Sequence, residues 1–140
     1  MKLFPFIISA LILLSCNTSN SQSLLDYRWK KRIVLLVDQD KDTDTLQSQL
    51  KRFLPFEHEL EERDMLIFVV SGKHVYNAKG TPMQLDIPKI LEGNFQGILL
   101  IGKDGGVKLE KSFEVAPSVI FDLVDSMPMR KSEKTSSRKH

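Results

Sequence analysis

The sequence predicts an α/β domain, and three kinds of segment support this fold class. Short runs made entirely of apolar residues occur at 33–37, 65–70 and 98–101. Such runs, rich in β-branched residues, are typical of strands that are covered on both faces. Amphipathic segments lie between and after these runs, and the sequence KDGG at 103–106 marks a tight turn. Strands that alternate with helices along the chain are the pattern of an α/β fold.

The first half of the domain is expected to be a strand–helix–strand unit. After the first apolar run, four apolar side chains follow i, i+4, i+7, i+8 spacing, which predicts an amphipathic helix. Pro55 should break or kink this helix, and residues 56–62 can add another turn. Because a helix joins the two strands, they should be parallel with a right-handed crossover. The four apolar positions are Leu46, Leu50, Phe53 and Leu54.

The second half should contain a hairpin. Residues 107–111 alternate between apolar and charged side chains, as a half-exposed strand near a sheet edge does. Only the KDGG turn separates them from the run at 98–101, so these two strands should be antiparallel neighbours. The connection at 71–84 shows neither the alternation of a strand nor the spacing of an amphipathic helix. It is expected to be a long irregular loop.

Two further helices are expected. One runs over 86–92, where Asp86 can cap the first turn and Gly93 can end the helix. The other covers 117–127 and ends at Pro128. The resulting order is β-α-β-α-β-β-α. It predicts a thioredoxin-like fold with a four-stranded mixed sheet and helices on both faces.

The N-terminal residues are typical of a lipoprotein signal peptide. Lys2 precedes an apolar run at 3–14 that is too short to span a bilayer but suits a secretory signal. The sequence Leu13-Leu14-Ser15-Cys16 resembles the bacterial lipobox, in which the cysteine is lipidated and becomes the new N-terminus. We therefore expect an exported protein, lipid-anchored at Cys16 in the bacterial cell envelope, on the periplasmic or outer-membrane side. Ordinary cleavage near 21–23, giving a secreted protein, is the alternative.

The predicted organisation has four parts. A signal peptide at 1–16 and a polar tether at 17–23 precede a thioredoxin-like domain at 24–130, and a basic disordered tail follows at 131–140. Residues 130–140 carry five Lys or Arg and one Glu, and no apolar residue. Residues 17–129 carry fourteen basic and seventeen acidic side chains, so the basic character comes from the tail. No basic face with interleaved aromatic residues is present, and nucleic-acid binding is not expected.

Cysteine content limits the chemistry of the domain. Cys16 is the only cysteine of the chain. If it is lipidated, the mature domain has no thiol for disulfides, thiolate metal sites or redox catalysis. His58, His74 and His140 are scattered and give no support to a zinc site. The sequence predicts no catalytic residue, metal ligand or cofactor, and it leaves enzymatic activity open.

Aspartates follow the first predicted strand at every second position. Ligands of α/β sheets gather at the carboxyl ends of parallel strands, and redox-active thioredoxin-like proteins carry their paired cysteines in this loop. A calcium loop would need glycine where Thr43 stands and glutamate where Gln49 stands. Capping of the following helix by Asp42 or Thr43 is the favoured interpretation, and a weak cation site is an alternative. The four aspartates are Asp38, Asp40, Asp42 and Asp44.

Other candidate binding residues are mostly basic. Arg and Trp anchor many interfaces, but arginines near strand ends also pair with carboxylates, for which Glu61, Glu62 and Asp64 are candidates. The candidates, with Asp38 and Asp40, are Arg28, Trp29, Arg32, Arg63, Lys103, Asp104 and Arg130.

Four sequence motifs belong together: Arg28-Trp29 with Arg32, Glu62-Arg63-Asp64, GKDGGVK at 102–108 and DSMPMR at 125–130. They are spread over about residues 24–130, nearly the whole mature domain, and they resemble one known family, the domain of unknown function 4174. The resemblance implies a thioredoxin-like domain of exported bacterial proteins, related to modules in animal extracellular-matrix and sushi-repeat proteins. It implies no reaction, cofactor or catalytic residue.

These observations favour a cysteine-free, non-redox binding or structural module. Its partner would be an envelope protein, a peptide or an envelope polymer, and the N-terminal lipid would hold it on the membrane. One alternative is a hydrolase-type or other non-thiol enzyme that uses Asp38 or Asp40 together with Arg63 or Lys103. Another is a calcium-dependent adhesion or matrix module.

Overall fold

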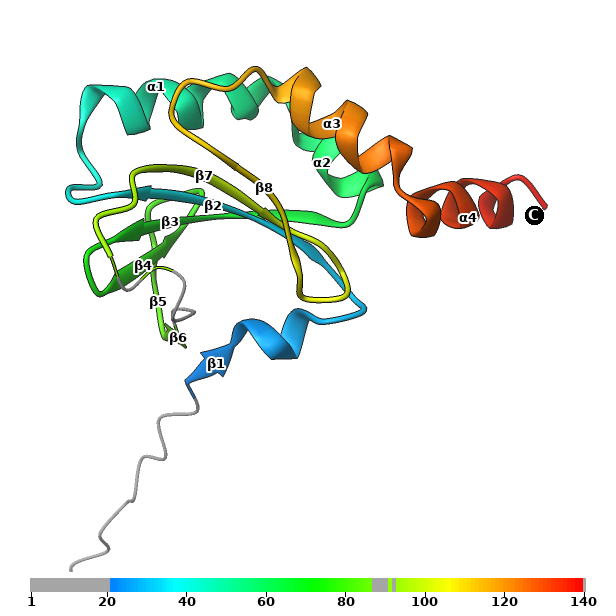
Figure 1. The fold of residues 1–140 in the computed structure, drawn as a ribbon, viewed down its shortest axis with the longest axis horizontal. Coiled ribbons are helices and arrows are strands. Elements are labelled where there is room, and N and C mark those ends of the chain that lie inside the picture. The colour runs from blue at the N-terminus through cyan, green and yellow to red at the C-terminus, as the bar shows by residue number, and fades with distance from the viewer. Residues whose placement is uncertain (1–20, 87–90, 92, 140) are drawn as a thin grey trace, which may run out of the picture.

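The computed structural model describes residues 21–86, 91 and 93–139. The strands of its main sheet are β2 (Arg32–Asp38), β3 (Met65–Ser71), β4 (His74–Asn77), β5 (Pro82–Met83), β7 (Gly97–Ile101) and β8 (Val107–Lys111). They lie in the order β5-β4-β3-β2-β7-β8 (Figure 1). A second sheet pairs two short parallel strands, β1 (Gln22–Ser23) and β6 (Leu85–Asp86). The α/β class is confirmed.

The three apolar runs form the centre of the sheet, as predicted. β2 pairs in parallel with β3, and the helical segment between them makes the crossover. β7 lies antiparallel on the other side of β2, and β8 completes the predicted hairpin. All residues of β2 and β7 are buried, because side chains cover both faces of these strands.

The prediction of four strands is wrong, because β4 and β5 extend the sheet to six. Both lie in the segment at 71–84 that was expected to be an irregular loop. β4 folds back antiparallel onto β3 through a turn at Gly72, which has a positive φ of 58°. Within β4 only Val75 is buried, and β5 is two residues long. Strands this short carry too few apolar positions to show alternation.

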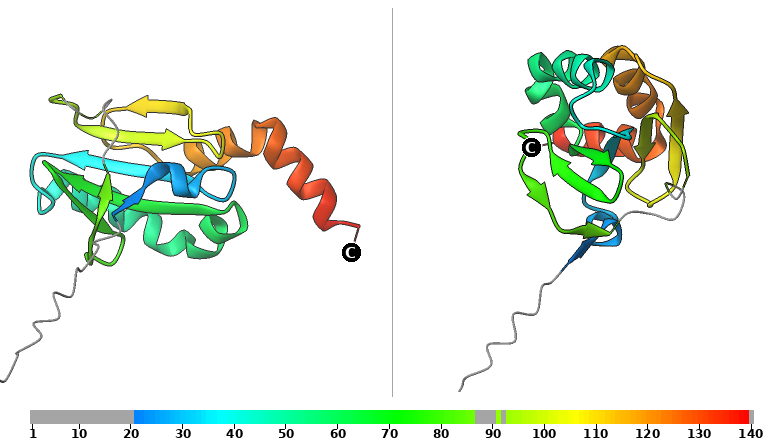
Figure 2. Two further views of the ribbon diagram at one scale, coloured as in Figure 1. Left: turned by 90° about the horizontal axis from the view of Figure 1, so that it is seen from below. Right: turned by 90° about the vertical axis from the view of Figure 1, so that its left-hand side faces the viewer.

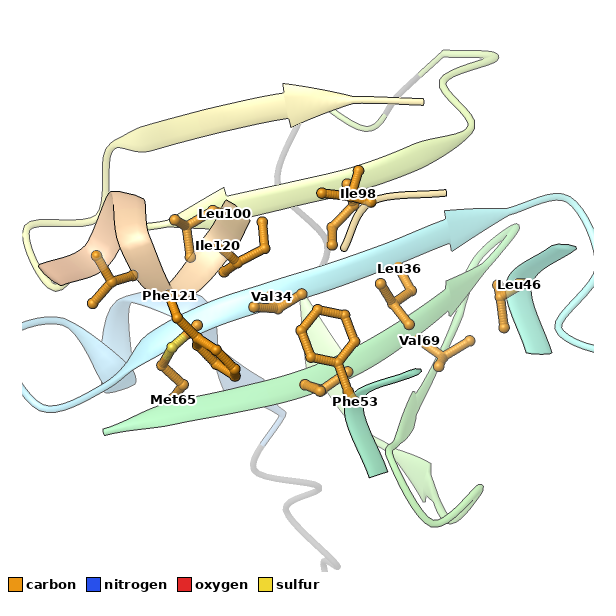
Figure 3. Close-up of a cluster of buried hydrophobic side chains, with 13 residues drawn as sticks. Val34, Leu36, Leu46, Phe53, Met65, Val69, Ile98, Leu100, Ile120 and Phe121 are labelled. Carbon is orange, nitrogen blue, oxygen red and sulfur yellow. The ribbon is translucent and has the colours of Figure 1, made fainter. Parts of the chain in front are cut away.

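One face of the sheet is covered by three α-helices, α1 (Asp44–Phe53), α2 (Glu57–Glu62) and α3 (Pro117–Ser126) (Figure 1). A short 3₁₀ turn, η2 (Leu54–Phe56), contains Pro55 and separates α1 from α2. Figure 3 shows the core between these helices and the sheet, where Phe53 and Phe121 lie against the strands. Burial of alternate side chains on this face fixes the register of the strands.

The opposite face is covered by the 3₁₀ helix η1 (Leu24–Tyr27) and by residues that follow β5. Helices on both faces were predicted, and among the described residues the 3₁₀ helix η1 is the helix on this second face. Asp86, expected to cap the helix at 86–92, lies in strand β6 and pairs with Ser23. The remainder of the helix expected at 86–92 lies outside the described residues, apart from Leu91.

A fourth α-helix, α4 (Pro128–Ser137), occupies the segment that was expected to be a disordered tail. The prediction of disorder is wrong for residues 131–137. Met127 is extended between α3 and α4, and Pro128 both ends one helix and begins the next. α4 leaves the end of the sheet at an angle to α3 (Figure 2). It was missed because ion pairs, rather than apolar side chains, hold it to the domain.

The predicted signal peptide at 1–16, with Cys16, lies outside the described residues, as does the tether up to residue 20. Within the described part of the chain, no helix has the length and apolar character needed to cross a membrane.

Candidate functional site

The loop after β2 is the first candidate site. Asp38 ends the strand and is largely buried, and both of its carboxylate oxygens accept hydrogen bonds. Oδ1 accepts from the Gln39 backbone N–H at 2.7 Å, and Oδ2 accepts from the Thr43 hydroxyl at 2.6 Å. Thr43 in turn caps α1, since its hydroxyl oxygen accepts from the Leu46 N–H. The predicted cap is confirmed for Thr43.

The next aspartates also act locally. Asp40 accepts from the Asp42 backbone N–H at 3.0 Å, and Asp42 pairs with Lys41 at 2.7 Å. Across the described ranges, no three His, Cys, Asp or Glu side chains are grouped as metal ligands. These hydrogen bonds shape the turn and begin the helix.

A second candidate site lies at the other end of the sheet, where β2 and β3 begin and β7 ends. Here basic and acidic side chains from five segments form what we call the ion cluster. The six residue steps of β2 place it about 20 Å from Asp38. The enzyme alternative requires Asp38 or Asp40 to lie close to Arg63 or Lys103. Because these residues lie at opposite ends of the sheet, that requirement is not met. The cluster contains Arg32, Arg63, Lys103, Arg130, Glu62, Asp64, Asp125 and Glu133.

Arg32 is the most buried member, with a side chain that is 1% exposed. Its two terminal nitrogens face the Glu133 carboxylate at 3.2 Å each, and Nη1 also donates to the Arg63 carbonyl at 2.8 Å. Arg32 Nε has no acceptor among the described residues. The paired geometry on Glu133 is the bidentate form in which guanidinium–carboxylate contacts are strongest.

Lys103 joins the same group from the end of β7. Its ammonium group donates to Asp64 at 2.8 Å and to Glu133 at 2.6 Å, and its side chain is 8% exposed. Glu133 therefore binds buried cations from β2 and from the β7–β8 turn, and the buried Arg130 of its own helix lies 3.7 Å away. These contacts attach α4 to the end of the sheet.

The remaining pairs attach α3 and α4 to the end of α2. Arg63 binds both oxygens of Asp125, at 3.1 and 2.9 Å, and its guanidinium lies 4.8 Å from the Phe121 ring centre. Arg130 donates to the Glu62 carboxylate at 2.6 Å and to the Glu62 carbonyl at 2.8 Å. Arg130 lies in the first turn of α4.

The surroundings of three acidic residues in the cluster favour their charged, deprotonated form. Burial alone would raise the pKa of Glu133, but hydrogen bonds from Lys103 and Arg32 hold that pKa below its ordinary value. The pKa values of Asp64 and Asp125 are lowered against the same opposing effect of burial, by Lys103 and Arg63 respectively. A depressed folded-state pKa stabilises the fold above the unfolded pKa, and this contribution is lost as the pH falls through the folded pKa.

A cavity of about 260 Å³ lies beside the cluster. The turn between β7 and β8 forms one wall, and the linker Met127-Pro128-Met129 forms the other. The sequence motifs at 102–108 and 125–130 therefore face each other across this space. An open groove of about 570 Å³ runs along α4 and shares Met129 with the cavity. The cavity lining is mainly apolar and comprises Arg32, Gly102, Lys103, Asp104, Lys108, Met127, Pro128 and Met129.

The other predicted residues lie near this end but outside the cluster. Asp104 pairs with Lys108 at 2.7 Å and accepts from the Gly106 N–H, as expected for a hairpin tip. Arg28 and Trp29 are exposed, and the Arg28 guanidinium lies 5.2 Å from the Trp29 ring centre. Sequence reasoning missed Glu133. Its i, i+3 spacing from Arg130 in a segment of mixed charge was the available signal.

Comparisons with known proteins agree with this fold. A family model described as domain of unknown function (DUF4174) matches residues 23–133. The match ends at Glu133, within α4. Among solved structures, the chain is similar to the reduced form of a 2-Cys peroxiredoxin from Plasmodium vivax. The two structures align with a TM-score of 0.55 and 12% sequence identity, and the alignment covers 78% of this chain and 84% of the other. No curated protein matches significantly. The structural similarity supports a thioredoxin-like fold and nothing further.

Proposed function

Because the chain belongs to the DUF4174 family, a family without an assigned function, we propose a role from its own residues. We propose that it is a non-redox, thioredoxin-like binding module carried on a lipid anchor at the bacterial cell envelope. Its partner would be an envelope protein, a peptide or a polymer segment.

Loss of redox chemistry is supported by the sequence and by the loop after β2. With Cys16 as the only cysteine, no pair of thiols exists in the chain. In the loop where redox-active proteins of this fold hold their cysteines, Asp38 and Thr43 bind each other and the backbone. These groups are engaged in the turn and the helix cap.

The observation that carries the binding role is the cavity between the β7–β8 turn and the Met127-Pro128-Met129 linker. Methionine side chains are flexible and polarisable, and they adapt to differently shaped apolar partners. Arg32 also lines the cavity, and its buried Nε–H is without an acceptor among the described residues. The site suits an extended segment that carries an apolar group.

Crosslinking at Met129 tests the binding role. A photo-crosslinking amino acid at this position, introduced into the full chain in its native host, should give a discrete adduct several-fold above controls. Matched controls are Val119, which is equally exposed at 39%, and Leu54, at 61%. Equal adducts at all three positions would mean random collisions and would contradict a binding site at the cavity. Mass spectrometry of the adduct identifies the partner.

The lipid anchor has a separate test. Cys16→Ala should move the protein from the membrane fraction to the soluble fraction, or block its maturation, because the acylated residue is lost. Mass spectrometry of the wild-type N-terminus should show a lipid on Cys16. Identical fractionation and electrophoretic mobility of variant and wild type would count against the anchor, leaving secretion by ordinary cleavage.

A further inference from the structure

The segment at 24–31, which we call the entry segment, connects the polar tether to β2. Its 3₁₀ helix η1 packs Leu24 and Tyr27 against the sheet. Residues three apart are eclipsed in a 3₁₀ helix, so Leu25 and Arg28 share an outward face. Leu25 is 69% exposed, and Trp29, which follows Arg28, is 59% exposed. Two large apolar side chains thus lie in solvent at the start of the domain.

Trp29 is held in an unusual backbone conformation. Its φ is +66°, in the left-handed region that bulky residues rarely adopt. The backbone is fixed there by a hydrogen bond from the Trp29 N–H to the Lys103 carbonyl, at 2.6 Å. The strain is not offset by burial of the indole. Strained backbone positions cluster at functional sites, so this fixed and exposed aromatic residue indicates a contact surface.

Basic residues flank Trp29 in the sequence. Arg28 and Lys30 are exposed, and the Arg28 guanidinium lies over the Trp29 ring. Lys31 is half-buried and pairs loosely with Asp64, at 3.6 Å. Asp26 is the only acidic residue of the entry segment. An apolar pair beside an excess of positive charge is complementary to an anionic lipid surface.

The proposed anchor would hold the entry segment next to such a surface. Seven polar residues, 17–23, separate Cys16 from Leu24. Fully extended, they reach at most about 25 Å. This step rests on the lipid anchor of the proposed function.

We propose that the entry segment docks on the anionic membrane that carries the anchor. Leu25 and Trp29 would enter the interfacial region, where tryptophan is favoured, and Arg28 and Lys30 would bind lipid phosphates. Because η1 lies on the opposite face of the sheet from α1, α2 and α3 (Figure 1), those helices would point away from the bilayer. The domain would then be oriented on the membrane, not tumbling on its tether.

Trp29 is the only tryptophan of the chain, so its fluorescence reports directly on this contact. The full mature chain is mixed with vesicles of phosphatidylcholine alone, or of phosphatidylcholine with phosphatidylglycerol. With the anionic vesicles, emission should shift to shorter wavelength, and lipids with brominated acyl chains should quench it. The double variant R28Q/K30Q should lose most of this response. The matched double variant K73Q/K79Q, exposed residues around β4, should keep it.

The outcomes separate docking from anchoring. Unchanged Trp29 emission on anionic vesicles, in protein whose Cys16 carries lipid, overturns the docking proposal and leaves the anchor intact. A shift that appears only with an added protein partner also overturns it. Emission that responds to anionic vesicles in the mature chain without lipid on Cys16 supports docking even where fractionation contradicts the anchor. Equal loss of response in the two double variants would mean non-specific charge attraction and would overturn the assigned surface.

Discussion

Replacing Arg32 with alanine is expected to lower the free energy of unfolding by about 3–5 kcal/mol, the cost of breaking a buried ion pair. Its guanidinium is 1% exposed and binds both oxygens of Glu133 and the Arg63 carbonyl. Removing it leaves Glu133 with Lys103 at 2.6 Å and the more distant Arg130 at 3.7 Å, and it leaves a cavity at the start of β2. Urea unfolding at neutral pH, followed by circular dichroism, measures the change.

An exposed ion pair provides the matched control. Arg52 contacts Glu114, but their side chains are 48% and 32% exposed. Arg52→Ala should therefore cost at most about 1 kcal/mol. In a double-mutant cycle, R32A/E133A should cost less than the sum of the single variants, because the two side chains interact directly. If Arg32→Ala costs no more than Arg52→Ala, the cluster does not fasten α4 to the domain.

The central strands could be predicted because both of their faces are apolar. A run such as 33–37 carries the signal in consecutive residues, and β2 is buried along its whole length. The crossover, the hairpin and the Thr43 cap also follow from residues close together in the sequence. β4 could not be found in this way, because its burial depends on pairing with β3 more than on its own pattern.

The candidate site could be predicted only in part. Arg32, Lys103 and Arg130 were each named from the sequence, but their common location was not. Arg32 and Glu133 are separated by 101 positions, and Lys103 and Asp64 by 39. The pattern of neighbouring residues in a sequence does not indicate ion pairs between residues so far apart. α4 was misjudged for the same reason, since the contacts that hold it are made with other parts of the chain.

Gln49→Ala is expected to destabilise the domain by about 3 kcal/mol, because it leaves two buried backbone groups without partners. The Gln49 side chain is fully buried. Its Oε1 accepts from the Val115 N–H at 2.6 Å, and its Nε2 donates to the Val115 carbonyl at 2.8 Å. One side-chain amide therefore satisfies both backbone hydrogen-bonding groups of Val115, in the segment that leads into α3. Thermal unfolding of the full chain measures the loss.

Two comparisons distinguish this bridge from a general effect on α1. Gln47, in the same helix, makes one hydrogen bond to the Lys41 carbonyl, so Gln47→Ala should cost only about 1 kcal/mol. Gln49→Glu keeps the size of the side chain but points a carboxylate at the Val115 carbonyl. It should be destabilising at neutral pH and less so in acid, since protonation restores a donor. Equal losses for the two alanine variants would contradict the bridge. In a calcium loop this position would hold the chelating glutamate, whereas here the amide joins α1 to the approach to α3.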